Sequence, residues 1–99
     1  MKTIEEMKKI LAEHKKGLEE KYGIKEIGIF GSYLRGEQKD TSDIDILVEF
    51  NPDARISLLD FVGVEDYISD LLGAKVDLVE KSALKPRIGK HILREVIYL

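Results

Sequence analysis

Apolar residues in the first part of the chain recur at alternating steps of three and four, which is the spacing of one face of an α-helix. Thr3 and Glu6 fit the capping box that starts a helix, and Gly23 is well placed to end it. The pattern therefore predicts an amphipathic helix between Thr3 and Gly23, with an apolar stripe of Ile4, Met7, Leu11, His14, Leu18 and Tyr22.

Three short stretches alternate between apolar and other residues, as half-buried β-strands do. They predict strands over residues 26–30, 43–50 and 75–79. The first strand runs into a turn at Gly31-Ser32, and the second ends at Asn51-Pro52. Between these strands, the polar stretch at residues 33–42 predicts a short helical turn followed by a loop.

Two more helical patterns follow. Apolar residues from Ile56 to Leu72 fall at helical spacing with Gly73 just past the end, and a closing helix is predicted from Pro86 to Tyr98. This order of elements predicts an α/β (α+β) fold, a small mixed β-sheet with helices packed on it. Because the sequence contains no repeat, low-complexity tract or linker, we expect residues 1–99 to form a single domain.

Composition narrows the functional classes. With 43% hydrophobic and 35% charged residues the chain is globular, and without cysteine it has no disulfide, thiolate metal site or cysteine nucleophile. A net charge of −3 disfavours an extended nucleic-acid-binding surface. No apolar run is long enough to span a membrane, and acidic residues near the N-terminus do not fit a signal peptide. We therefore expect a cytoplasmic protein.

The strand over residues 43–50 contains unexpected carboxylates. Asp43 and Asp45 share one face with Leu47 and Glu49, because side chains alternate across a strand. The opposite face, formed by Ile44, Ile46, Val48 and Phe50, is predicted to face the core. Two carboxylates about 7 Å apart at Cα repel each other unless a cation lies between them.

The donor types indicate which cation is suitable. Oxygen ligands without nearby histidine or cysteine favour Mg²⁺ or Mn²⁺. Asp77 lies in the middle of the third strand, and it joins Asp43 and Asp45 if that strand pairs beside the second in matching register. Three acids around two metal ions form an arrangement that supports phosphoryl or nucleotidyl transfer.

The turn between the strands is a candidate phosphate site. Gly31 allows backbone N–H groups to approach a phosphate, Ser32 adds a hydroxyl, and Arg35 lies one helical turn further on. Each feature also has an ordinary structural explanation: the glycine and serine as a plain turn, Arg35 as a solvent-facing side chain, and Asp77 as an acid on an edge strand. The P-loop and EF-hand patterns are both absent.

Gly31-Ser32, followed after ten residues by Asp43-Ile44-Asp45, resembles the signature of the DNA polymerase β-like nucleotidyltransferase superfamily. The runs Gly-Ser-Tyr-Leu-Arg-Gly and Ser-Asp-Ile-Asp are similar to the minimal nucleotidyltransferase (MNT) branch. The similarity extends to Leu72–Val79 and to a closing Leu-Lys-Pro helix, and so covers nearly the whole chain. It implies a polymerase β-like nucleotidyltransferase fold.

The resemblance also implies roles for individual residues. Asp43, Asp45 and Asp77 would bind two Mg²⁺ (or Mn²⁺) ions and the triphosphate of ATP, and Asp77 would help to deprotonate the acceptor hydroxyl. The nucleotide-binding residues would be Gly31, Ser32, Arg35 and Ser42.

Members of this branch include MntA-like antitoxins, which are paired with HEPN-domain toxins and transfer AMP from ATP to a toxin tyrosine. Larger nucleotidyltransferases carry a second domain that presents the acceptor, and none follows this core, so we expect the acceptor surface to come from a partner. The resemblance therefore implies a Mg²⁺-dependent protein adenylyltransferase that acts as an antitoxin.

Two alternatives remain open at this point. The protein could neutralise its partner by binding alone, with the metal site no longer used, or it could modify a small molecule. The closing helix is amphipathic and locally basic, which suits either a packed helix with a solvated face or contacts with a nucleotide or partner.

Overall fold

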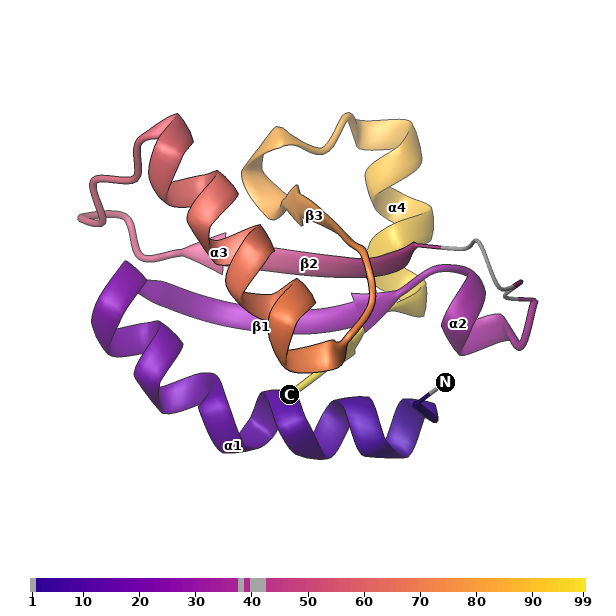
Figure 1. The fold of residues 1–99 in the computed structure, drawn as a ribbon. Helices are drawn as coiled ribbons and strands as arrows, with labels where there is room; N and C mark the ends of the chain where they lie inside the picture. The colour runs from indigo at the N-terminus through magenta and orange to yellow at the C-terminus, as the bar shows by residue number, and fades with distance from the viewer. Residues whose placement is uncertain (1, 38, 40–42) are drawn as a thin grey trace.

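The fold was analysed in a computed structural model that describes residues 2–37, 39 and 43–99. Among these residues no helix is both long and apolar enough to cross a membrane. Figure 1 shows the elements, which in chain order are α1 (Ile4–Tyr22), β1 (Ile24–Phe30), α2 (Ser32–Arg35), β2 (Ile44–Phe50), α3 (Leu58–Leu72), β3 (Val76–Glu80), a 3₁₀ turn η1 (Lys81–Ala83), α4 (Pro86–Glu95) and β4 (Ile97–Tyr98).

The four strands form one mixed sheet in the order β3-β2-β1-β4. β1 pairs antiparallel with both β2 and β4, whereas β2 and β3 are parallel. A parallel pair needs a crossover connection, and α3 supplies it. The predicted mixed sheet with helices packed on it is confirmed.

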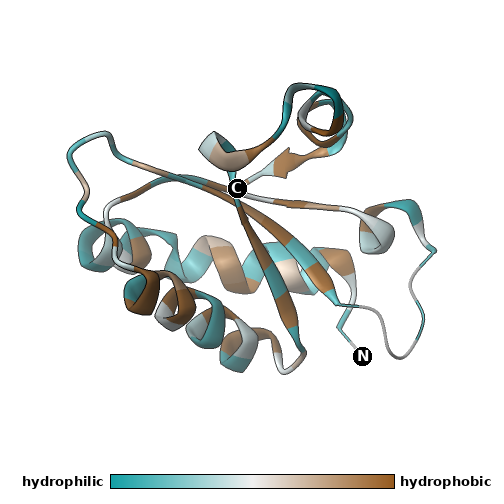
Figure 2. Cartoon of the chain, turned by 90° about the horizontal axis from the view of Figure 1, so that it is seen from above, coloured by the Kyte–Doolittle hydropathy of each residue, from teal (hydrophilic) through white to brown (hydrophobic). Residues whose placement is uncertain are grey.

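Two helices cover one face of the sheet. α1 and α3 lie side by side on it (Figures 1 and 2). Both helices begin with a capping box, which Thr3 forms with Glu6 in α1 and Ser57 forms with Asp60 in α3. Apolar side chains from these helices and the strands form the core, which includes Met7, Leu11, Leu18, Ile27, Ile29, Ile44, Ile46, Val48, Val64, Ile68, Leu72 and Val76. The predicted core face of β2 is therefore correct.

α4 lies on the opposite face of the sheet (Figure 2). Leu47, which the alternation placed on the face of the aspartates, is only 1% exposed. Both faces of β2 are thus covered at this position. The aspartate face thus carries Asp43 and Asp45 at the start of β2, the buried Leu47 in the middle, and Glu49 near the end.

The end of the chain differs from the prediction. The closing helix was expected to reach Tyr98, but α4 ends at Glu95, and Ile97 and Tyr98 pair with β1 as β4. The pairing depends on Gly28: a β-carbon there would stand 2.6 Å from Cγ2 of Val96 and 2.9 Å from the carbonyl oxygen of Ile97. The bare backbone of β1 therefore allows the C-terminal segment to approach closely.

The outer edge of β3 is closed by side chains of α3. The N–H of Val76 donates to Oγ of Ser69 at 3.2 Å, and the N–H of Leu78 donates to Oε2 of Glu65 at 3.0 Å. These are outward-pointing donors of an edge strand, which would otherwise be open to pairing with another chain. α3 thus provides the crossover and also protects the edge that it creates.

Candidate functional site

Acidic side chains gather where β2 and β3 begin. In the parallel register Asp45 lies directly beside Asp77, as the alternation predicted. Asp43 precedes Asp45 by two residues, just before β2. Two neighbouring strands therefore bring three carboxylates to one end of the sheet.

The electrostatics of this cluster are unfavourable without a cation. Partial burial raises the pKa of Asp45, and the negative charges of Asp77 and Asp43 raise it further. Asp43 Oδ2 lies 3.9 Å from Nζ of the exposed Lys75, but solvent screens this ion pair strongly. The described cluster is thus a region of excess negative charge.

The donor set fits a hard divalent cation. Within the described part of the chain, no three His, Cys, Asp or Glu side chains are arranged so that they could hold a metal ion by themselves. An all-protein cage is not what Mg²⁺ requires, because this ion keeps several waters and uses one or two carboxylates together with substrate phosphates. Asp77 is exposed and Asp43 is half-buried, so solvent or a ligand can reach the cluster.

Gly31 connects the acids to the turn after β1. Its backbone has φ +88° and ψ −155°, a conformation that favours glycine, and a β-carbon there would stand 2.0 Å from Oδ2 of Asp45. The carbonyl of Gly31 accepts from the N–H groups of Leu34 and Arg35 at 3.1 and 3.4 Å. Because α2 is a single turn of four residues, a phosphate here would depend on individual donors and little on a helix dipole.

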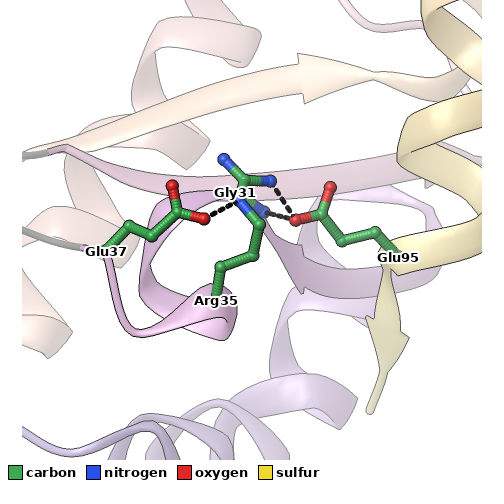
Figure 3. A network of polar contacts seen from close by, with 4 residues as sticks. All are labelled: Gly31, Arg35, Glu37 and Glu95. Atoms are coloured by element: carbon green, nitrogen blue, oxygen red, sulfur yellow. Dashed lines mark hydrogen bonds and ion pairs between the residues drawn. The ribbon is translucent and has the colours of Figure 1, made fainter.

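The other predicted nucleotide-binding residues fall in different places. Ser32 is half-buried at the first position of α2, next to Gly31. Ser42 lies outside the described residues. Arg35, which was expected to point either to a phosphate or to solvent, lies between two carboxylates (Figure 3): its Nε donates to Oε1 of Glu37 at 2.9 Å, and its Nη1 pairs with Oε1 of Glu95.

Glu95 is a site residue that sequence reasoning missed. Its Oε1 also accepts the N–H of Gly31 at 3.2 Å, so one carboxylate oxygen binds both the turn and the guanidinium (Figure 3). An acid at the last position of a basic helix was a possible signal, because the negative end of a helix dipole disfavours a carboxylate there unless it is paired. The partners are 60 and 64 residues away, so no local pattern identifies them.

Comparison with known families agrees with this arrangement. The family model for the nucleotidyltransferase domain matches residues 11–99. The chain belongs to the nucleotidyltransferase family. This confirms both the resemblance and the enzyme class that the sequence suggested.

Relatives of this nucleotidyltransferase include the protein adenylyltransferase MntA of Thermococcus cleftensis, which is 54% identical over 99 residues, or 100% of this chain and 98% of the relative. A solved structure described as a minimal nucleotidyltransferase is 34% identical, with a TM-score of 0.73 over 94% of this chain and 95% of that one. A chain from the complex of a tri-AMPylated Shewanella oneidensis HEPN toxin with its MNT antitoxin shares the fold, with a TM-score of 0.65 at 18% identity over 93% of this chain and 70% of that one.

The candidate site combines two kinds of group. The carboxylates of β2 and β3 provide negative oxygen donors, and the turn after β1 provides an N–H and a guanidinium. Gly31 and Asp45 are in direct steric contact, so the two kinds of group are adjacent. A metal-bound triphosphate carries both the cations and the anionic oxygens that such a surface complements.

Proposed function

We propose that this nucleotidyltransferase transfers AMP from ATP to a hydroxyl group of a partner protein, a tyrosine of a HEPN-domain toxin, and thereby acts as its antitoxin. The observation that carries the proposal is the pairing of Asp45 with Asp77 directly beside Gly31. The name of the Thermococcus relative, at 54% identity over the whole chain, supports protein as the acceptor.

In this proposal Asp43, Asp45 and Asp77 hold two Mg²⁺ or Mn²⁺ ions. When bound, the ions neutralise charge on the triphosphate and on the oxygens that enter and leave at the α-phosphorus. The raised pKa of Asp45 supports this role. It reflects partial burial and repulsion among the three carboxylates, and a bound cation would offset that repulsion.

The phosphates beyond the reacting centre are held by the turn after β1. The N–H of Gly31, the hydroxyl of Ser32 and the guanidinium of Arg35 are donors suited to phosphate oxygens. Ser42 is proposed as a further nucleotide-binding residue. Since the α-phosphorus must face both the metals and the acceptor, these donors serve mainly to orient the triphosphate.

The reaction follows from this placement. The acceptor oxygen attacks the α-phosphorus in line, a new P–O bond forms, and the bond to the β-phosphate breaks to release pyrophosphate. Asp77 takes the hydroxyl proton as the oxygen attacks. Asp77 is exposed on the edge strand β3, so a side chain from another protein can reach it from outside the sheet.

The proposed partner is a protein because the described site presents an open rim rather than its own acceptor. Among fold neighbours, the Shewanella antitoxin is bound to a tri-AMPylated HEPN toxin, which supports the same class of partner here. The chain's net charge of −3 gives no general attraction to a nucleic-acid acceptor.

The test is to incubate purified protein with Mg²⁺, α-labelled ATP and a HEPN-domain toxin from the same genome. Label should move to the toxin with the wild type and with the control Asp53→Asn, and it should be lost with Asp43→Asn and Asp45→Asn, whose folding is checked by circular dichroism. Equal labelling by the Asn variants would refute the metal assignment. Full protection of a host by an unlabelled Asp45→Asn complex would instead identify an antitoxin that acts by binding alone.

A further inference from the structure

One oxygen of Glu95 occupies the donors that the proposed function assigns to phosphate. Oε1 accepts the N–H of Gly31 and also pairs with Nη1 of Arg35 (Figure 3). A carboxylate oxygen and a phosphate oxygen are both negatively charged acceptors. Either can accept hydrogen bonds from a backbone N–H and from a guanidinium. The Glu95 carboxylate therefore occupies the position at this turn that a phosphate oxygen of the nucleotide would take.

The carboxylate is held there by the path of the chain. Glu95 ends α4, and the chain then pairs alongside β1 as β4, where the missing side chain of Gly28 lets Val96 lie against the strand. The side chain of Glu95 is 23% exposed, compared with 62% for Glu37, the other carboxylate that contacts Arg35. Of these two, Glu95 is the more enclosed, and it alone is hydrogen-bonded to Gly31.

We propose that Glu95 is a displaceable substitute for a nucleotide phosphate and sets the affinity of the site for triphosphate. The carboxylate must leave Gly31 and Arg35 before phosphate oxygens can take these donors, so part of the binding free energy of the nucleotide is used in the exchange. The inference rests on the proposed function for its assignment of these donors to phosphate, and it adds a residue that the proposed reaction does not otherwise use.

The charges around Asp45 support an exchange rather than simultaneous binding. Glu95 is one of the negative groups that act on Asp45, together with Asp77 and Asp43, whereas Arg35 acts in the opposite direction. A triphosphate beside Glu95 would add further negative charge at the same donors. Departure of the carboxylate removes that repulsion and leaves Arg35 available to the phosphate.

The chain offers a matched pair of variants to test the exchange. Glu95→Gln keeps size and removes charge at the residue bound to Gly31 and Arg35. Glu37→Gln makes the same change at a carboxylate that bonds to Arg35 and, within the described residues, not to Gly31. Isothermal titration with Mg-ATP and with Mg-tripolyphosphate should show a Kd at least about tenfold lower for Glu95→Gln, and a change below about twofold for Glu37→Gln.

Tripolyphosphate separates the phosphate contribution from that of the base and sugar. Under the proposal it reproduces the gain seen with Mg-ATP, because the competition concerns phosphate oxygens. In an Arg35→Ala background the gain from Glu95→Gln should shrink, because part of the contested donor set is gone. An unchanged or higher Kd for Glu95→Gln with both ligands would overturn the inference.

A measurement on the wild type guards against a variant that misfolds. As Mg-tripolyphosphate is added to labelled protein, the Gly31 amide resonance and the Glu95 side-chain carboxyl resonance should change with the same midpoint. A shift of Gly31 with an unchanged Glu95 carboxyl would contradict the exchange.

The outcomes also separate this inference from the proposed function. Tighter binding by Glu95→Gln without AMP transfer to a toxin would support the exchange and refute the transfer reaction. If the wild type transfers AMP and its Kd for Mg-ATP equals that of Glu95→Gln, the transfer reaction is supported and the exchange is refuted. Absence of Mg-ATP and Mg-tripolyphosphate binding to every form would overturn both.

Discussion

Gly31 and Asp45 are packed so closely that a β-carbon on the glycine would stand 2.0 Å from a carboxylate oxygen of the aspartate. We expect Gly31→Ala to displace the Asp45 carboxylate and abolish Mg-ATP binding. Gly36→Ala is the matched control, because Gly36 also has a positive φ, of 69°, but a β-carbon there meets nothing within 4 Å.

The control should cost about 1–2 kcal/mol of unfolding free energy, the usual penalty of a left-handed backbone for an L-residue, and should retain binding. Gly31→Ala should cost more. Denaturant unfolding and titration calorimetry measure both effects, and equal losses in the two variants would contradict the steric explanation.

Asp45 is expected to destabilise the metal-free protein at neutral pH. Partial burial together with Asp77 and Asp43 raises its pKa, so the folded state binds the proton more tightly than the unfolded state. Its favourable contribution is therefore present below the ordinary value of 3.8 and is lost as the pH rises through the folded-state pKa.

Asp45→Asn should accordingly unfold at higher urea concentration than the wild type at pH 7 without metal. The difference should narrow as the pH falls toward 3.8. Urea titrations across this range test it, with the exposed Asp53→Asn as the comparison. A variant that is less stable than the wild type at pH 7 would show that Asp45 makes a favourable contact instead.

Mg²⁺ should reverse that destabilisation in the wild type. A ligand that binds only the folded state at a concentration of 100 Kd adds about 2.7 kcal/mol to the free energy of unfolding. We expect Mg²⁺ to raise the melting temperature of the wild type and of Asp53→Asn, and EDTA to remove the gain. Thermal melts of Asp45→Asn should be unaffected by Mg²⁺, and an equal response in this variant would exclude the carboxylate as a ligand.

We expect Glu65 to contribute more to the free energy of unfolding than an ordinary surface residue of a helix. Its carboxylate accepts the N–H of Leu78 on the edge strand, and a hydrogen bond to a charged group contributes about 1.5–3 kcal/mol. Glu65→Ala should lose that amount in denaturant unfolding, whereas Asp66→Ala, at the exposed next position, should change little. Amide hydrogen exchange should accelerate at Leu78 in the first variant, and unchanged exchange there would contradict the contact.

Local patterns were sufficient to predict β1, β2 and β3 and the placement of Asp45 beside Asp77. Alternation placed Asp45 opposite the core-facing isoleucines of β2, and the same alternation placed Asp77 on β3 so that matching register joins them. Gly31 could be proposed for its freedom of backbone conformation. Its contact with Asp45 could not, because that depends on how the turn folds back over the neighbouring strand.

The C-terminal part of the site was beyond local reasoning. The spacing of Ile92, Val96 and Ile97 continues a helical pattern, so a helix to Tyr98 was a reasonable prediction. A β-branched pair before an aromatic residue also suits a strand, and pairing with β1 at Gly28 decides between the two. With β4 paired to β1, Glu95 at the end of α4 lies next to Gly31.

The occupied edge of β3 limits how a partner can approach the acids. At Val76 and Leu78, on either side of Asp77, the outward N–H groups are already bonded to Ser69 and Glu65. A peptide cannot extend the sheet there by β-augmentation without first breaking these bonds. Under the proposed function, the acceptor hydroxyl would therefore arrive on a side chain that reaches over the rim of the sheet, and the protein that carries it would not need to add a strand to β3.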